Sequence, residues 1–232
     1  MTAPLLEKRS SAISDPTRYF EQFPALSVIP RMRHGFALRV PGIDVAHEKT
    51  VALRHLDGVH LQIRGALGVA DMPFITAQQV HGSRIAAVTA ANEDGCLGAC
   101  DGLVTDRPNI CLGIYVADCC AVYLVDPVRN AIGLVHSGRK GTGLGVAINA
   151  IDTMRDKFGS EPADLIVQLS PCIRPPHYEI DFAAEIVAQC RSVGVRNIHD
   201  SAKCTACEPE RYYSYRAEKG RTGRMVALLA LF

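Results

Sequence analysis

The chain has 232 residues, of which 48% are hydrophobic and 21% are charged, and its formal net charge at pH 7 is +1. This length and apolar content suffice for one large buried core, so a single domain is the default expectation. Charges of both signs are interspersed, which leaves no electrostatic footprint for nucleic acid or for an anionic membrane surface. We therefore expect neither of these as a partner.

The N-terminal stretch, residues 1–24, mixes charged residues with Ser and Pro and lacks the apolar core of a secretory signal. This predicts a loosely ordered lead-in, followed by one domain over residues 25–232. No apolar run of about 18 residues occurs in the chain, so no transmembrane helix is expected. The nine cysteines are typical of free or metal-binding thiols in a reducing compartment, which predicts a cytoplasmic protein.

Three short apolar runs follow one another in the middle of the chain, at residues 110–116, 121–125 and 131–135. Each reads as a buried strand. Because short neighbouring strands joined by tight turns pair antiparallel, at least part of the sheet should be antiparallel. This favours an α+β fold over a doubly wound parallel one.

The helical signals are clearest after these strands. Apolar residues spaced along one face predict a helix over residues 144–158, which ends at Gly159. Its N-terminus would present free N–H groups, which could bind a phosphate. A strand is predicted over residues 163–169 and a second amphipathic helix over residues 182–193.

Three separated fragments offer His81, Cys119 and His136 as an open metal site. Cys119 and His136 each follow an apolar run, so adjoining strand ends could bring them together. Cys119 and Cys120 point to opposite faces of an extended backbone, so only one of them could serve a given site. Three nitrogen and sulfur ligands leave one tetrahedral position free, which is the arrangement of catalytic zinc. Two close cysteine pairs are a possible structural zinc site instead: Cys96 with Cys100, and Cys204 with Cys207.

The same fragments belong to a longer series of motifs that resembles the YfiH family, whose members are also called laccase-domain or polyphenol-oxidase-like proteins. The motifs occur in the family's order and span roughly residues 34–232. They are Gln79-Val-His-Gly82, Asp101-Gly-Leu-Val-Thr105, Ala117-Asp-Cys119, His136-x-Gly138-x-x-Gly141, Pro171-Cys-Ile-x-Pro175, Tyr178-Glu179, Cys204-Thr205 and Tyr213-Ser-Tyr-Arg216.

The resemblance implies a single-domain layered sandwich, with mixed and partly antiparallel sheets flanked by helices, and one zinc ion per chain bound by His81, Cys119 and His136. It implies a purine nucleoside phosphorylase, a transferase that uses phosphate to release a free base and ribose 1-phosphate. The implied substrates are adenosine, inosine, guanosine and methylthioadenosine. Adenosine deaminase activity, which is hydrolytic, is implied as well.

The older name laccase conflicts with the histidine content of the chain. A multicopper oxidase needs about ten histidines, several in His-x-His pairs, to hold its copper ions. This chain has eight histidines and no such pair. A mononuclear zinc site is the simpler interpretation.

The motifs also contain candidates for proton transfer and for phosphate binding. Asp118 and Glu179 are the candidate acid/base groups, although a carboxylate beside a ligand can equally serve to orient it. Phosphorolysis also requires cations that hold the phosphate, and the candidates are Arg39, Lys140 and Arg216. The alternative is that these three are solvated surface charges.

The fragment after His136 departs from the family pattern. It reads His-Ser-Gly-Arg-Lys-Gly, where the family commonly has His-Ala-Gly-Trp-Arg-Gly. Arg139 thus replaces an aromatic platform, and Lys140 cannot reproduce the planar fork of arginine. Two other classes of function stay open: a metal-free hydrolase with Cys119 as its nucleophile, and a catalytically silent, zinc-stabilised binding module. The sequence decides neither the oligomeric state nor the preferred nucleoside.

Overall fold

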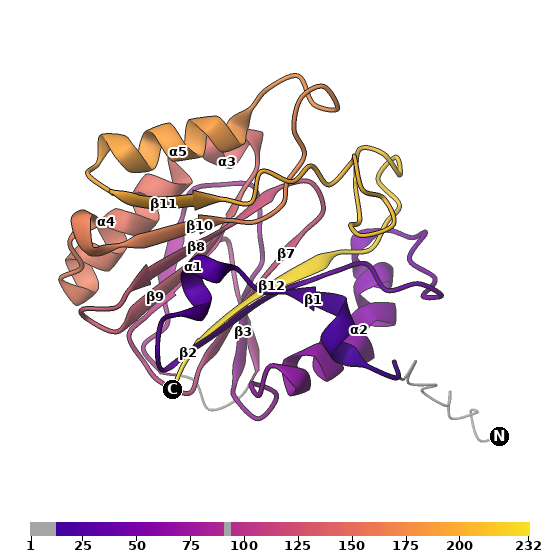
Figure 1. Ribbon diagram of the computed structural model, residues 1–232, viewed down its shortest axis with the longest axis horizontal. Helices are drawn as coiled ribbons and strands as arrows, with labels where there is room; N and C mark the ends of the chain where they lie inside the picture. Colours follow the sequence, from indigo (N-terminus) through magenta and orange to yellow (C-terminus); the bar gives the residue numbers. More distant parts are fainter. Residues whose placement is uncertain (1–12, 91–93) are drawn as a thin grey trace.

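The structure is a computed structural model, and it describes residues 13–90 and 94–232. The described strands form two sheets of six strands each. The sheets pack on each other, and helices cover their outer faces: Figure 1 shows α4 and α5 on one side of the molecule and α2 on the other. The predicted α+β class and the layered, mixed sheets with flanking helices are confirmed.

The first sheet is antiparallel at one end and parallel at the other. Its pairs from β1 to β7 are antiparallel, whereas β3 pairs parallel with both β7 and β5. In spatial order its strands are β1 (Phe20–Glu21), β2 (Met32–Ala37), β12 (Met225–Leu231), β7 (Cys111–Val116), β3 (Phe74–Ala77) and β5 (Gly95–Leu97).

The second sheet is antiparallel in its centre and parallel at both edges. The edge pairs β11 with β10 and β4 with β6 are parallel, and the inner pairs are antiparallel. In spatial order its strands are β11 (Asn197–Asp200), β10 (Ile166–Leu169), β8 (Cys120–Asp126), β9 (Ala131–Ser137), β6 (Gly102–Thr105) and β4 (Ile85–Ala87).

The described helices differ greatly in length. None of them is long and apolar enough to cross a membrane. They are the α-helices α1 (Pro24–Ser27), α2 (Lys49–Ala66), α3 (Arg139–Gly143), α4 (Val146–Phe158) and α5 (Phe182–Ser192), and the 3-10 helices η1 (Pro16–Tyr19) and η2 (Pro162–Asp164).

Three clusters of buried apolar side chains hold the layers together. The central cluster fills the space between the two sheets and contains Phe36 and Tyr123, both fully buried. A second cluster joins the second sheet to α4 and α5 through residues such as Met154 and Ile186. A third joins the first sheet to α2, where Ile63 is fully buried. Because the interior is close-packed, both sheets form a rigid frame for the loops at their edges.

The connection between β7 and β8 differs from the expected hairpin. β7 lies in the first sheet and β8 in the second, so the runs 110–116 and 121–125 do not pair. Residues 117–119 carry the chain from one sheet to the other, and Asp118 adopts a φ of 81° within this turn. The expected antiparallel pairing of residues 121–125 with 131–135 is present as β8 with β9. Nearly all of β7 is buried, so its apolar pattern could not indicate which sheet it joins.

Two other predicted elements are shorter in the structure. The helix predicted over residues 144–158 begins at Val146, because Gly145 has a φ of 70°, a left-handed conformation that separates α4 from α3. The strand predicted over residues 163–169 begins at Ile166, because η2 occupies the residues before it. The helix predicted over residues 182–193 is confirmed as α5.

The predicted lead-in is partly built into the fold. Its residues 1–12 lie outside the described residues, but the rest carries η1 and β1. Phe20 and Glu21 pair with β2, and Phe23 is 5% exposed. The physical reason is that Phe23 packs against the rings of His34 and Tyr123 and so buries apolar surface. The many charged residues of the segment did not indicate this burial in the sequence.

Candidate active site

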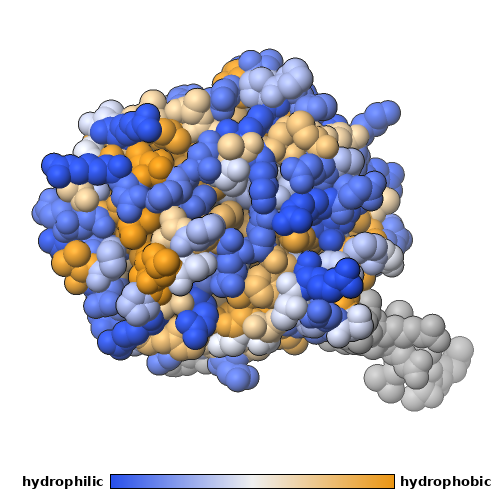
Figure 2. Space-filling view, viewed as in Figure 1, coloured by the Kyte–Doolittle hydropathy of each residue, from blue (hydrophilic) through white to orange (hydrophobic). Residues whose placement is uncertain are grey.

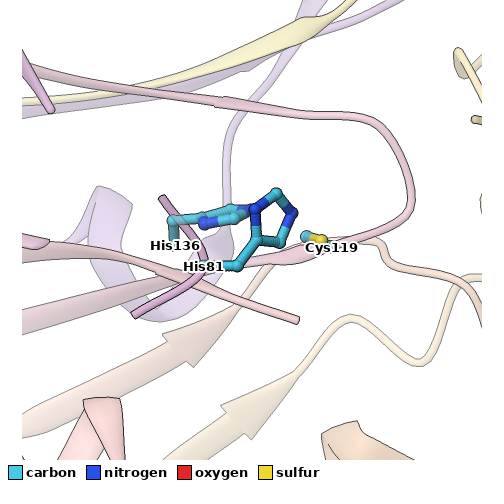
Figure 3. A group of neighbouring side chains, drawn as sticks. All are labelled: His81, Cys119 and His136. Atoms are coloured by element: carbon cyan, nitrogen blue, oxygen red, sulfur yellow. The ribbon is translucent and has the colours of Figure 1, made fainter. Parts of the chain in front are cut away.

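The three predicted metal ligands meet at the edge where the two sheets come together. Their ligand atoms all lie within 4.8 Å of one another, and Figure 3 shows the side chains as neighbours. His81 comes from the loop after β3, Cys119 from the turn between β7 and β8, and His136 from the end of β9. The site therefore draws on both sheets, and its geometry depends on their packing.

Asp101 is the structural link between the two histidines. Its carboxylate accepts hydrogen bonds from the backbone N–H groups of Val80, His81 and Gly82, at 3.2, 2.8 and 2.7 Å. It also accepts a hydrogen bond from Nδ1 of His136 at 2.9 Å. In the neutral form of His136 this bond keeps the proton on Nδ1 and leaves Nε2 with a free electron pair, which is the state a metal ligand requires. Sequence reasoning assigned no role to Asp101, although it begins one of the family motifs.

The backbone around the site is held in uncommon conformations. Gln79, His81 and Asp118 have φ angles of 62°, 58° and 81°, in the left-handed region that non-glycine residues rarely adopt. Gly138 is required for a different reason, since a Cβ atom there would lie 2.6 Å from Sγ of Cys119. Such strain and close approach cluster at functional sites, where the surrounding structure maintains them.

The site favours a thiolate facing a protonated imidazole. Burial alone raises the pKa of the Cys119 thiol, but the charge and hydrogen bonds of His136, supported by those of His81, lower it to about 6. Burial lowers the pKa of His136, but the Cys119 charge and the hydrogen bond to Asp101 raise it to about 9. A thiolate is the metal-binding form of cysteine.

The donor set fits zinc. Two imidazoles and one thiolate are ligands that zinc prefers, and an aspartate that orients one imidazole is the usual outer partner of such a ligand. The site also faces a cavity of about 950 Å³, so a fourth position is accessible to a small molecule. His81, Cys119 and His136 all line this cavity.

The rest of the cavity is strongly cationic and partly aromatic. Among the described residues of its lining, Asp118 is the carboxylate, whereas the cations and aromatic rings are numerous. The cations are Lys49, Arg139, Lys140, Arg216, Lys219 and Arg224, and the rings belong to Tyr115, Tyr178, Phe182 and Tyr215. A cavity of this size and charge suits an aromatic ligand together with an anion.

Three of the five other predicted site residues line the cavity: Asp118, Lys140 and Arg216. Asp118 accepts hydrogen bonds from the Thr205 hydroxyl at 2.7 Å and from the backbone N–H of Arg216 at 2.7 Å. Glu179 lies outside the lining and forms ion pairs with Arg216 at 2.9 Å and with Arg139 at 3.5 Å. It therefore bridges two cations at the rim of the cavity.

Arg39, predicted to contact the phosphate, lies outside the cavity lining. Its Nη2 donates to Glu218 at 2.5 Å, its Nε donates to the carbonyl of Tyr212, and its guanidinium stacks 4.5 Å from the Tyr213 ring centroid. The segment after β2 packs on residues 211–218 instead. Arg39 thus supports the loop that carries Arg216.

Sequence reasoning missed Lys49, Lys219 and Arg224 as cavity residues. Lys49 begins α2 and Arg224 immediately precedes β12, so they lie far apart in the chain. A lysine at the start of an amphipathic helix has the pattern of an ordinary surface charge. Arg224 directly precedes the apolar run of β12. This position beside a buried strand was the available signal that Arg224 is itself buried.

The alternative structural zinc site of four thiolates does not form. Cys96 and Cys207 are exposed and free, and within residues 13–90 and 94–232 neither cysteine pair belongs to a group whose ligand atoms converge. A second convergent group contains Asp44 and His47, from the segment before α2, and His55, from the second turn of that helix. Hydrophilic and hydrophobic residues are interspersed on the face of the molecule in Figure 2.

Comparison with known proteins places the chain in a family. The family model described as multi-copper polyphenol oxidoreductase laccase matches residues 59–189 and 179–232. The chain belongs to this family, which is the YfiH family indicated by the motifs.

Named relatives are phosphorylases. The chain is 28% identical over 195 residues to purine nucleoside phosphorylase YlmD of Geobacillus stearothermophilus, covering 67% of this chain and 71% of the relative. It is 27% identical over 207 residues to YlmD of Bacillus subtilis, with coverage of 70% and 74%. A purine nucleoside phosphorylase of Clostridium acetobutylicum is 31% identical over 155 residues, with coverage of 56% and 66%.

Solved structures agree with the fold. The YfiH protein of Bacillus licheniformis superposes with a TM-score of 0.76 at 27% identity, covering 87% of this chain and 93% of that one. YlmD of Geobacillus stearothermophilus superposes with a TM-score of 0.79 at 22% identity, covering 92% and 98%. The layered architecture is thus that of the family.

Proposed function

We propose that this protein is a zinc-dependent purine nucleoside phosphorylase. The observation that carries the proposal is the convergence of His81, Cys119 and His136 on one wall of a cavity whose other walls are rich in cations and aromatic rings. The names of the relatives supply the reaction class. In this reaction an oxygen of inorganic phosphate bonds to C1′ of the ribose while the bond from C1′ to the purine nitrogen breaks. The leaving base keeps the electron pair and takes up a proton.

The metal would be held by His81, Cys119 and His136, one ion per chain. When bound there, zinc supplies Lewis acidity at the edge of the cavity. The histidines need no reorganisation for this, because Asp101 already fixes the His81 backbone and the His136 ring. The multicopper name of the family does not fit this donor set, since copper oxidases need many more convergent histidines.

The aromatic rings and cations of the lining would orient the two substrates. Tyr178 and Tyr215 offer faces for a purine, and Arg216 lies 5.2 Å from the Tyr178 ring centroid. Lys140 and Arg216 would contact the phosphate, as positive charges facing the cavity. We propose adenosine, inosine, guanosine and methylthioadenosine as the substrates.

Proton transfer would fall to Asp118, the carboxylate of the described lining. The hydroxyl of Thr205 and the N–H of Arg216 hold its two oxygens in place, which orients the group for exchange with the leaving base. Glu179 is half-exposed and bound to two arginines, so we assign it the positioning of Arg216 in place of the acid/base role. Adenosine deamination at the same site is part of the proposal.

The test is incubation of metal-analysed protein with adenosine, with and without phosphate, followed by chromatographic separation of adenine, inosine and hypoxanthine. We expect adenine only when phosphate is present, and inosine from deamination without it. Cys119→Ser should remove both the metal and the activity, whereas Cys96→Ser, at an exposed thiol outside the cavity lining, should leave both unchanged. Zinc-loaded protein that forms none of these products would contradict the proposal.

A second candidate function follows from the thiolate that faces His136. Such a pair is also the arrangement of a Cys-His hydrolase, in which Cys119 attacks an acyl carbon and the imidazolium protonates the leaving group. Metal-free protein would then hydrolyse ester substrates, and alkylation of Cys119 would abolish that turnover. Turnover that requires zinc and is lost to a chelator contradicts this candidate.

The third possibility, a silent binding module, makes the opposite prediction. Removal of zinc would unfold the protein, and no nucleoside would be converted. The large cavity with its unpaired cations argues against it, because a structural metal site needs no such cavity.

A further inference from the structure

Two cations of the cavity lining, Lys49 and Arg224, are wholly or partly buried without a counter-ion. Lys49 and Arg224 both line the cavity, and neither forms an ion pair with any residue in the part of the chain that the structure describes. At the rim, by contrast, Arg139 and Arg216 share the carboxylate of Glu179. Lys140 and Lys219 also lack an ion pair among the described residues, but both are exposed, whereas Lys49 is half-buried and Arg224 is buried.

Arg224 is fixed in place but only partly used by the protein. The residue is 8% exposed, and its Nη1 donates to the carbonyls of Thr222 at 2.7 Å and Gly223 at 2.9 Å. Its guanidinium lies 5.7 Å from the ring centroid of Tyr215. Nε and Nη2 have no hydrogen-bond partner among the described residues. A guanidinium anchored by one nitrogen, with further donors free in a cavity, is prepared for an external acceptor.

Lys49 stands in an electrostatically unfavourable position. It is the first residue of α2, where the helix dipole repels a positive charge, and the first turn of this helix contains no acidic residue. Its side chain has no hydrogen bond or ion pair to the described residues. Burial lowers the pKa of Lys49, and the nearby charge of Arg224 lowers it further. Burial and the charge of Arg224 therefore both disfavour the charged form of Lys49.

Both cations lie beside the metal site. Cys119, Lys49 and Arg224 line the same cavity, and the charge of Cys119 acts on both cations. A metal ion bound to the thiolate would offset its negative charge and leave the two cations less compensated. An anionic ligand at this end of the cavity would relieve the repulsion between them.

We propose that Lys49 and Arg224 form a binding site for a tetrahedral phosphate group next to Cys119. The assignment of inorganic phosphate as its occupant rests on the proposed phosphorylase function, whereas the phosphate group of a nucleotide is the other source of the same chemistry. The free nitrogens of Arg224 would bind two oxygens of the group, and Lys49 would act as a point charge. Lys140 and Arg216, both exposed, would then supply the outer and weaker contacts to the phosphate.

Phosphate binding without any nucleoside tests the site directly. Isothermal titration of inorganic phosphate into zinc-loaded, full-length protein should show one site. Lys49→Gln should weaken its binding by about 10- to 100-fold, which is the usual effect of losing a charged hydrogen bond, and Lys49→Arg should restore most of the affinity. Lys157→Gln, at an exposed lysine outside the cavity lining, is the control and should leave phosphate binding within about 2-fold of the parent protein, and Lys140→Gln should weaken binding less than Lys49→Gln does.

Arg224 is buried, so its removal tests folding as well as binding. Arg224→Lys keeps the charge and loses the fork, and it should weaken phosphate binding while the circular dichroism spectrum and thermal midpoint stay close to those of the parent protein. Phosphate binding that is unchanged in Lys49→Gln and in folded Arg224→Lys would overturn the proposal. Loss of binding in Lys140→Gln alone would overturn it as well.

A second titration separates the two sources of phosphate. If inorganic phosphate is the occupant, Lys49→Gln raises the KM for phosphate and leaves the KM for adenosine within about 2-fold. If a nucleotide is the occupant, adenosine monophosphate binds more tightly than adenosine to the parent protein, and Lys49→Gln removes the difference. Phosphate binding that depends on Lys49, in a protein that converts no nucleoside, would sustain the site and contradict the phosphorylase function alone.

Discussion

Asp101 and His136 are joined by a hydrogen bond of 2.9 Å from Nδ1 of the imidazole to a carboxylate that is fully buried. The same carboxylate accepts the backbone N–H groups around His81. One side chain therefore fixes the ring of His136 and the backbone of His81, two of the three candidate metal ligands. Its hydrogen bonds lower the pKa of Asp101 despite a burial that raises it, so the charged form is retained at neutral pH.

The first prediction concerns this link. Asp101→Asn should weaken zinc binding by about 10- to 100-fold, because an amide is a weaker partner for His136 and can present N–H where an acceptor is needed. Competition with a chromophoric chelator measures the affinity. Asp126→Asn is the matched control, since Asp126 is another fully buried carboxylate that caps a turn outside the cavity lining. Equal zinc affinity in both variants would contradict the role of Asp101.

The second prediction concerns the close approach of Gly138 to Cys119. Gly138→Ala should displace the thiol, because the added Cβ would lie 2.6 Å from Sγ, and zinc affinity and activity should both fall by at least about 10-fold. Gly143→Ala, at the end of the helix α3 that Gly138 caps, is the control, since nothing lies within 4 Å of a Cβ there. Zinc titration of both variants distinguishes them. A Gly138→Ala protein with parental zinc affinity would show that the thiol is not held in this place.

The third prediction separates the two roles considered for Glu179. Glu179→Gln removes its ion pairs with Arg139 and Arg216, which are more than half exposed, so the stability should change by less than about 1 kcal/mol. A positioning role predicts a kcat that falls by less than about 10-fold, with an increased KM for phosphate. Loss of about 100-fold or more in kcat, with an altered pH profile, would instead assign acid/base catalysis to Glu179. Steady-state kinetics over a range of pH decide between them.

The fourth prediction is a loss of stability in mild acid. Burial lowers the pKa of His34 to about 4, and burial likewise lowers the pKa of His60 to about 4. The unfolded chain has ordinary histidine pKa values of about 6.5, so it binds more protons than the native state below that pH. The contribution of each histidine is fully present above pH 6.5. It is lost as the pH falls from about 6.5 to about 4, by up to about 1.4 kcal/mol per pH unit for each.

His34 offers a way to isolate this effect. Its Nε2 accepts the backbone N–H of Phe23 at 2.7 Å, and a glutamine oxygen can accept the same bond without titrating. Chemical denaturation at pH 7 and pH 5 should show a smaller pH-dependent loss in His34→Gln than in the parent protein. Other groups cancel in this difference. Identical losses in the two proteins would mean that His34 is not buried in its neutral form.

The sequence alone was enough to predict the class of fold and the group of three side chains that could hold a metal ion. His81, Cys119 and His136 are recognisable because each occupies a short motif beside a strand or turn, and such motifs are local. The α+β class and α5 were predictable for a similar reason, since apolar periodicity reports which face of an element is buried. The limits of α4 were less clear, because the pattern could not reveal the left-handed Gly145.

The tertiary structure decided how these pieces combine. It placed β7 and β8 in different sheets, and it made Asp101 the link between two ligands. It also turned Arg39 toward Glu218 and brought Lys49 and Arg224 into the cavity from opposite ends of the chain. The physical reason is that burial patterns record how much of a side chain is covered, not by which partner. Long-range pairing and the convergence of charges depend on contacts between segments that share no local signal.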